Sequence, residues 1–175
     1  MTPARAGRVA LLLLLAYWTF VFLWWPMRQD TVGASFLHLI NLPIHEAGHI
    51  LFSPFGDFMT TLGGSLMQVL VPIAFCIAFL TTSWNPFGAA VTAWWAGENL
   101  LDVAIYINDA RSLQLMLLGG PADEVEGHDW EHILQSLNML HWDHRLGWGA
   151  HIAGAIVMIG ALGVGAAIAM RAPAD

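Results

Sequence analysis

The sequence contains no lysine, so its six arginines are the only side chains that carry a permanent positive charge. With a net charge of −7 over 175 residues, the chain offers no basic surface on which a nucleic acid could bind. The single cysteine, Cys76, excludes an intramolecular disulfide and lies in an apolar run, where it suits a core or lipid-facing position. Only 11% of the residues are charged and 57% are hydrophobic, which indicates a polytopic membrane protein.

Five apolar stretches are long enough, or nearly so, to cross a bilayer, which takes about 20 helical residues. They are residues 9–27, 34–55, 58–82, 86–107 and 146–170. The first follows Arg5 and Arg8 but lacks a small-x-small cleavage site, so we expect an uncleaved signal anchor. The sequence therefore predicts one all-α domain over residues 1–175, an integral membrane helix bundle of about five transmembrane helices plus a surface amphipathic helix.

The second stretch is the least certain span, because it contains His38, Asn41 and Pro43. Hydropathy alone leaves open whether it crosses the membrane or is a re-entrant segment that lines a cavity. If it crosses, four of the six arginines share one side; if it does not, they divide three and three. The positive-inside rule therefore favours five spans with a cytoplasmic N-terminus, in a bacterial inner membrane. Pro43 predicts a kink or a new helix start near Leu42.

Two other segments have a recognisable pattern. Between the fourth and fifth stretches, residues 109–145 are polar and acidic, and apolar residues recur there at helical spacing: Trp130, Ile133, Leu134, Leu137 and Leu140. This pattern predicts an amphipathic helix on the membrane surface or against the bundle. The last stretch contains Gly149-x₄-Gly154 and Gly160-x-x-Gly163, and such small residues favour close helix packing, within the core formed with residues 34–108 or in a homo-oligomer.

The residues His45-Glu46-Ala47-Gly48-His49 form an HExxH motif inside the second stretch. In a helix, positions i and i+4 lie one above the other, so His45 and His49 present two imidazoles to one Zn²⁺ ion. Glu46 lies beside them, where a carboxylate can accept a proton from water as a general base. Because ionisable groups are costly at membrane depth, the motif indicates a functional site.

A catalytic zinc usually has three protein ligands and one open position, so a third ligand is needed. Asp102, deep in the stretch 86–107, is the best candidate. At about 1.5 Å per residue, His49 lies about 22 Å along the second stretch and Asp102 about 24 Å along the fourth. If these stretches run parallel, the two residues have equal height. Glu98, one turn earlier on the same face, is the second candidate, and Asn99 could orient a ligand or bind the substrate backbone.

Alternatives remain open for these residues. The HExxH match can arise by chance, with the histidines bonded to backbone carbonyls. Asp102 can be a buried structural carboxylate bonded to Arg111 or Tyr106.

His128 and His132 form a second i,i+4 histidine pair, in the acidic segment. A solvated helix face, or a helix cap by Asp129, is the more common explanation for such a pattern. We therefore predict that both histidines lie outside the primary metal site, on a surface helix that covers it.

Taken together, these motifs resemble the site-2 protease class of intramembrane zinc metalloproteases, over roughly residues 34–108. That class has HExxH on one core span, a glycine-led motif of the type Gly-Pro-x-x-Asn on the next, and an aspartate ligand on the third. The matching residues are His45-Glu46-Ala47-Gly48-His49, Gly64-Ser65-Leu66-Met67-Gln68 and Asn99-x-x-Asp102. Val103 stands where the family usually has glycine, and there is no PDZ-like insertion. The resemblance is greater to minimal bacterial relatives than to the larger members.

The resemblance implies an intramembrane zinc metalloendopeptidase with one Zn²⁺ per chain, held by His45, His49 and Asp102. Glu46 would activate water, and Gln68 would hydrogen-bond an extended substrate drawn from a membrane protein or peptide. Two other classes remain as alternatives. One is a metal-binding pseudoprotease that acts as a partner subunit, which would have no need of a base at Glu46. The other is a histidine-rich iron or copper oxidoreductase, although only two histidine pairs have ligand spacing.

Overall fold

The computed structural model describes residues 2–28, 32–118, 120–124 and 127–170. Within them the chain is mostly helical, as predicted, and forms α1 (Pro3–Trp24), α2 (Phe36–Phe52), α3 (Asp57–Thr81), α4 (Pro86–Asn108), α5 (Asp129–Ser136) and α6 (Asp143–Met170). Two 3-10 turns, η1 (Ser53–Phe55) and η2 (Leu140–Trp142), precede α3 and α6. A short antiparallel hairpin, β1 (Met116–Leu117) and β2 (Gly120–Pro121), follows α4.

Side-chain caps fix where the helices begin. The Ser35 hydroxyl accepts a hydrogen bond from the His38 backbone N–H and starts α2. The Asn85 side chain does the same for Gly88 at the start of α4, where Pro86 occupies the first turn. α2 is continuous from Phe36 through Pro43, so the predicted new helix start near Leu42 does not occur.

α4 lies at the centre of the bundle and packs on both α3 and α6, while α1 covers α6. Glycine permits the closest contact: a Cβ atom at Gly97 would lie 2.8 Å from the Gly154 carbonyl oxygen, so the α4 and α6 backbones almost touch there. Around this crossing is a buried apolar core that includes Phe22, Trp94 and Leu101. Gly154 of α6 therefore serves packing within the chain, whereas Gly149, Gly160 and Gly163 contact no other helix.

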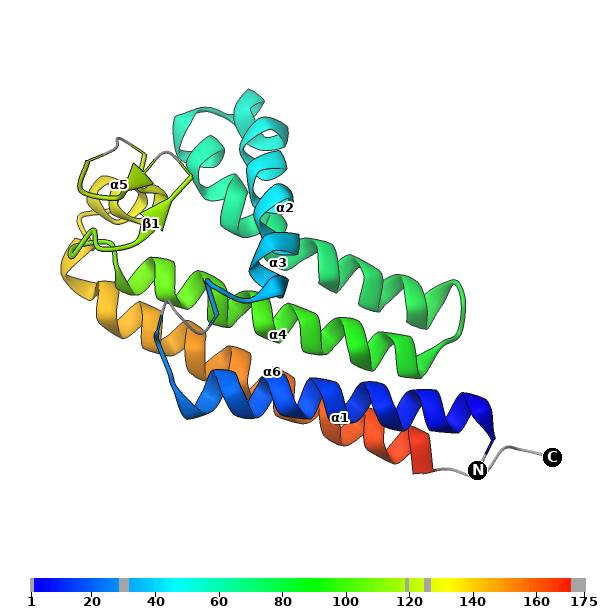
Figure 1. Ribbon diagram of the computed structural model, residues 1–175. Coiled ribbons are helices and arrows are strands. Elements are labelled where there is room, and N and C mark those ends of the chain that lie inside the picture. The colour runs from blue at the N-terminus through cyan, green and yellow to red at the C-terminus, as the bar shows by residue number, and fades with distance from the viewer. Residues whose placement is uncertain (1, 29–31, 119, 125–126, 171–175) are drawn as a thin grey trace.

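The long helices run in alternating directions. Near the end of α6, a Cβ atom at Gly165 would meet Leu12 of α1 and Ala90 of α4, whereas Gly147 at the start of α6 lies against Asn108 at the end of α4. Figure 1 accordingly shows the start of α1 and the end of α6 at the same end of the bundle, with α2 beside the first half of α3 and steeply inclined to α1, α4 and α6. This differs from the five-span prediction, which puts the two ends on opposite faces of a membrane.

Within the described residues, three helical segments are long and apolar enough to cross a membrane: α1, α3 and the stretch Leu140–Met170. This is consistent with a membrane protein. α2 has only 17 residues. At about 1.5 Å per residue it is about 26 Å long, slightly short of the roughly 30 Å hydrocarbon core.

The predicted amphipathic helix is α5, and it packs against α3 and α4. Ile133 and Leu134 are buried, but Leu137 is half exposed and lies beyond the end of the helix. The helix is shorter than the apolar pattern suggested because Asn138 adopts a left-handed conformation with φ 56°, which ends a helix.

Candidate metal centre

The crossing of α2 and α3 brings the HExxH motif against a helix made locally of small residues. A Cβ atom at Gly63 would lie 2.7 Å from the Gly48 carbonyl oxygen, so the two backbones are in contact. One residue further along α3, Gly64 faces the imidazole rings of His45 and His49. The sequence Gly63-Gly64 thus leaves open space where the histidines point.

Both histidines are held with their Nε2 atoms toward one point. The Gln68 amide donates to the Asp102 carboxylate at 2.8 Å, which fixes its carbonyl oxygen toward His45. That oxygen accepts from His45 Nδ1 at 3.0 Å, and the Thr60 backbone carbonyl accepts from His49 Nδ1 at 2.8 Å. Because each Nδ1 donates to an oxygen, each Nε2 is the ring atom that faces the cluster, where it can bind a metal ion once it carries no hydrogen.

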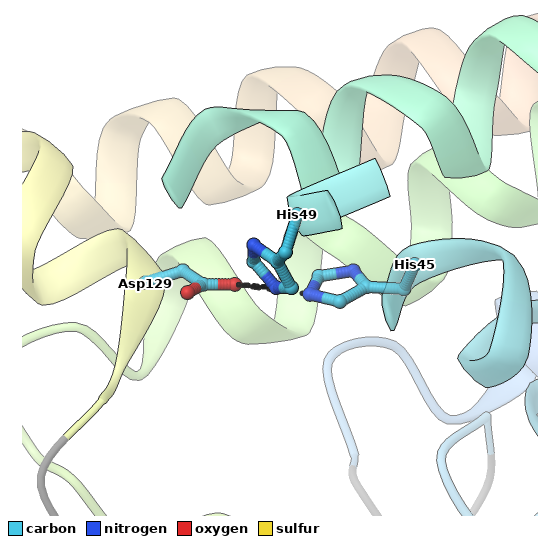
Figure 2. A group of neighbouring side chains, drawn as sticks. All are labelled: His45, His49 and Asp129. Atoms are coloured by element: carbon cyan, nitrogen blue, oxygen red, sulfur yellow. Dashed lines mark hydrogen bonds and ion pairs between the residues drawn. The ribbon is translucent and has the colours of Figure 1, made fainter. Parts of the chain in front are cut away.

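The third member of this cluster is Asp129, the first residue of α5. Its Oδ2 atom lies 2.9 Å from His45 Nε2 and 3.3 Å from His49 Nε2, and ligand atoms of the three residues all lie within 4.8 Å of one another. Figure 2 shows the three side chains pointing toward one another from two separate elements, α2 and α5. Among the residues that the structure describes, no other group of this kind was found.

The arrangement fits a small divalent cation. Two ligands that each lie about 2.0–2.1 Å from a tetrahedral zinc ion are about 3.3 Å apart, close to the separations seen here. Two nitrogen lone pairs and a carboxylate repel at such distances unless a cation or a proton lies between them. A Cβ atom at Gly64 would lie 2.5 Å from His45 Nε2 and 2.7 Å from His49 Nε2, so only glycine leaves room beside both ligand atoms.

Asp129 is ionised, as a ligand must be. Burial raises the pKa of its carboxyl group, but the contacts with His45 and His49 outweigh burial and hold this pKa below its usual range. The His45, His49 and Asp129 cluster can therefore hold a metal ion.

The cluster opens onto a cavity of about 720 Å³. Glu46 lines the same cavity as the two histidines. The rest of the wall is largely apolar and comes from α2, α4 and the hairpin: Leu39, Leu42, Val103, Ile105, Leu115 and Leu117. The site thus combines a polar end with a space that suits an apolar ligand.

Asp102, predicted as the third ligand, lies elsewhere in the same cavity. Its carboxylate accepts from His38 Nδ1 at 2.9 Å and from the Gln68 amide at 2.8 Å, and it supplies no atom to the metal cluster. The reason is geometric: α2 crosses the long helices, so equal distances along α2 and α4 do not give equal heights. Asp102 instead contacts His45 indirectly, through Gln68.

The other candidate residues divide into buried structural groups and residues near the cluster. Glu98 is fully buried and accepts from Asn41 at 2.9 Å, and Asn99 donates to the Trp95 carbonyl. The structure places neither of them in the metal cluster. Gln68 lines the cavity, but its amide is engaged by His45 and Asp102 rather than left free for a substrate.

The second histidine pair lies next to the cluster but outside it. His128 caps α5, where its Nδ1 atom accepts from the Glu131 backbone N–H, and His132 is exposed on the helix surface. Asp129 lies between these two histidines and belongs to the cluster. From the sequence it was expected to be a helix cap. The apolar face of α5 is the one sequence feature that could have indicated the role of Asp129. Such a face predicts that α5 docks on the bundle, and docking brings its first residue close to α2.

Comparison with protein-family models, characterised proteins and solved structures found no match to this chain.

Proposed function

We propose that this chain is a membrane-embedded zinc metalloendopeptidase that hydrolyses peptide bonds of membrane-associated substrates. The observation that carries the proposal is the convergence of His45, His49 and Asp129 on one point, with Glu46 on the wall of the adjoining cavity. Two imidazoles and one carboxylate are a usual ligand set for catalytic zinc, and they leave a fourth position open. The presence of Glu46 favours catalysis over metal storage, because binding alone needs no general base.

The roles of the residues follow from their positions. His45, His49 and Asp129 would hold the ion, and a zinc ion bound there supplies Lewis-acid chemistry. Glu46 accepts a proton from the attacking water and passes it to the leaving amine. Gln68 and Thr60 hold the imidazoles in the tautomer that binds metal. The apolar cavity wall suits an unwound, hydrophobic peptide segment.

The helix arrangement supports a topology in which α1, α3, α4 and α6 cross the membrane and α2 does not. α6 runs antiparallel to α1 and α4. An even number of membrane crossings must therefore lie between α1 and α6 along the chain. The metal centre then lies near the membrane face on which α2 and α5 sit, where water has access.

The test compares Glu46→Gln with the unchanged protein in proteoliposomes. The amide keeps the size of the side chain but cannot accept the proton, so we expect one zinc per chain in both proteins and hydrolysis slowed by roughly 10²–10⁴-fold in the variant. Zinc is measured by elemental analysis, and hydrolysis by mass spectrometry of a panel of apolar transmembrane peptides. Glu124→Gln, an exposed acid outside the cavity, is the control.

Two results would contradict the proposal. Absence of stoichiometric zinc would show that the cluster is not a zinc site. Zinc without cleavage of any peptide by the unchanged protein would favour the metal-binding partner subunit, and stoichiometric iron or copper would favour the oxidoreductase.

A further inference from the structure

The third metal ligand belongs to a segment that is separate from the helices that carry the other two. Asp129 starts α5, an eight-residue helix, and follows the polar residues that come after α4. The packing of α2 on α3 places His45 and His49 but has no direct effect on Asp129. Other contacts must therefore hold the start of α5 in position.

The first such contact comes from Tyr106, in the last turn of α4. Its hydroxyl oxygen accepts a hydrogen bond of 2.9 Å from the Asp129 backbone N–H. Its ring lies 4.4 Å from the ring of His128, centroid to centroid, and 6.0 Å from that of His45. Tyr106 thus contacts both the ligand residue and the residue before it.

The second contact joins His128 to Asp109. His128 Nδ1 accepts from the Glu131 backbone N–H at 3.1 Å, so in the neutral ring the hydrogen is on Nε2. Nε2 lies 3.4 Å from Asp109 Oδ2, which is within ion-pair distance, and it forms no hydrogen bond of good geometry with any described residue. The His128 side chain is almost completely buried, so this orientation is fixed by its surroundings.

Asp109 is itself held firmly at the end of α4. Its carboxylate accepts from the Ser112 hydroxyl at 2.6 Å and from the backbone N–H groups of Gln114 and Leu115 at 2.9 and 3.0 Å. Burial raises the pKa of this carboxyl group, but the contact with His128 and the hydrogen bonds from Ser112 and the two backbone groups outweigh burial and lower it. A charged, immobile acceptor therefore faces His128.

Tyr106 and Asp109 are one helical turn apart, so they lie on one side of the end of α4. They contact the 128–129 dipeptide at two points. We propose that Tyr106, Asp109 and His128 are positioning residues that hold the Asp129 carboxylate in the metal centre. None of the three supplies an atom to the cluster; each acts through Asp129. The inference rests on the metal centre of the proposed function but not on peptide hydrolysis.

The experiment measures the dissociation constant of zinc by competition with a chromophoric chelator, in detergent-solubilised full-length protein. Two variants remove one contact each: Tyr106→Phe keeps the ring and loses the hydroxyl, and His128→Asn keeps a good helix cap and loses the contact with Asp109. We expect each to weaken zinc binding by about 10–100-fold, the usual effect of losing an outer partner of a ligand. His132→Asn, the same substitution four residues later on the exposed surface of α5, should leave it unchanged.

A double-mutant cycle shows whether the residues act through Asp129. In an Asp129→Ala background, Tyr106→Phe and His128→Asn should weaken zinc binding no further. Zinc affinity within twofold of the unchanged protein in both single variants would overturn the inference, whatever happens to the thermal stability of the metal-free protein. An equal loss of zinc affinity in His132→Asn would also overturn the inference. If Asp129→Ala itself leaves zinc affinity unchanged, the metal centre of the proposed function fails instead.

Discussion

The residues of the candidate metal centre differ in how well their roles can be predicted from the sequence. His45, Glu46 and His49 are predictable because their relation is local: the helix repeat alone puts the two imidazoles on one face. Asp129 is not predictable in this way, because its contact with His45 spans 84 residues and depends on how α5 docks. Gly64 is an intermediate case, since it belonged to a glycine-led motif whose role beside the ion site appears only in three dimensions.

Gly64 provides the sharpest test at the scale of one residue. In Gly64→Ala the new methyl group would lie 2.5 Å from His45 Nε2 and would displace the imidazoles. Displacing ligands directly should cost more than removing their outer partners, so we expect zinc affinity to fall by about 100-fold or more. Gly149→Ala in α6, where the methyl group meets nothing within 4 Å, is the matched control. Equal zinc affinity in both variants would show that the ion does not sit beside Gly64.

At the scale of elements, the helices and their approximate bounds follow from apolar runs and caps, but their crossing angles do not. The depth argument for Asp102 assumed that α2 and α4 are parallel, which no local pattern can establish. Gly48 and Gly63 instead let the α2 and α3 backbones come into contact, and α2 is steeply inclined to α4. The carboxylate that meets the histidines comes from α5 rather than from α4.

Two aspartate variants separate these possibilities. Asp129→Ala removes a ligand, and we expect less than stoichiometric zinc after gentle purification. Asp102→Asn removes a charge that contacts His45 only through Gln68, so zinc should remain near one per chain while its affinity falls by about 10–100-fold. Elemental analysis and chelator competition give both quantities. The reverse result, zinc kept in Asp129→Ala and lost in Asp102→Asn, would restore Asp102 as the ligand.

The crossing of α4 and α6 makes a second prediction at this scale. At Gly154 a Cβ atom would already overlap the Leu101 side chain and approach the Gly97 backbone, so Gly154→Val should destabilise the bundle by about 1–3 kcal/mol through overpacking. Gly160→Val places the same side chain on the same helix where nothing lies within 4 Å, so it controls for helix propensity. Thermal unfolding in detergent measures both. Loss of stability in Gly160→Val alone would point to an interface between chains at that face.

At the scale of the whole molecule, composition alone predicted a helical fold, but the antiparallel packing of α6 against α1 and α4 could not be predicted from it. Charge counting favoured five spans, because the arginines divide evenly if α2 does not cross. The four-crossing topology that we propose therefore depends on one helix, the one that carries the motif.

Reporter fusions test the topology directly. If α1, α3, α4 and α6 cross and α2 does not, reporters fused to the two ends of the chain should lie on the same side of the membrane, together with a reporter inserted at the turn between α3 and α4. A reporter inserted at Asn138, between α5 and α6, should lie on the opposite side. Alkaline phosphatase and fluorescent protein fusions distinguish the two sides. Ends on opposite sides would support the five-span arrangement.

The order in which the metal ligands occur along the chain has a consequence for biosynthesis. His45 and His49 leave the ribosome early, whereas Asp129 follows His45 by 84 residues and comes after the whole of α4. The growing chain therefore enters the membrane with two imidazoles and no complete ion site. If the proposed function is right, the chain has no complete metal centre while its own hydrophobic segments are being inserted, and a messenger truncated before the codon for Asp129 yields a protein with the HExxH motif but without its third ligand.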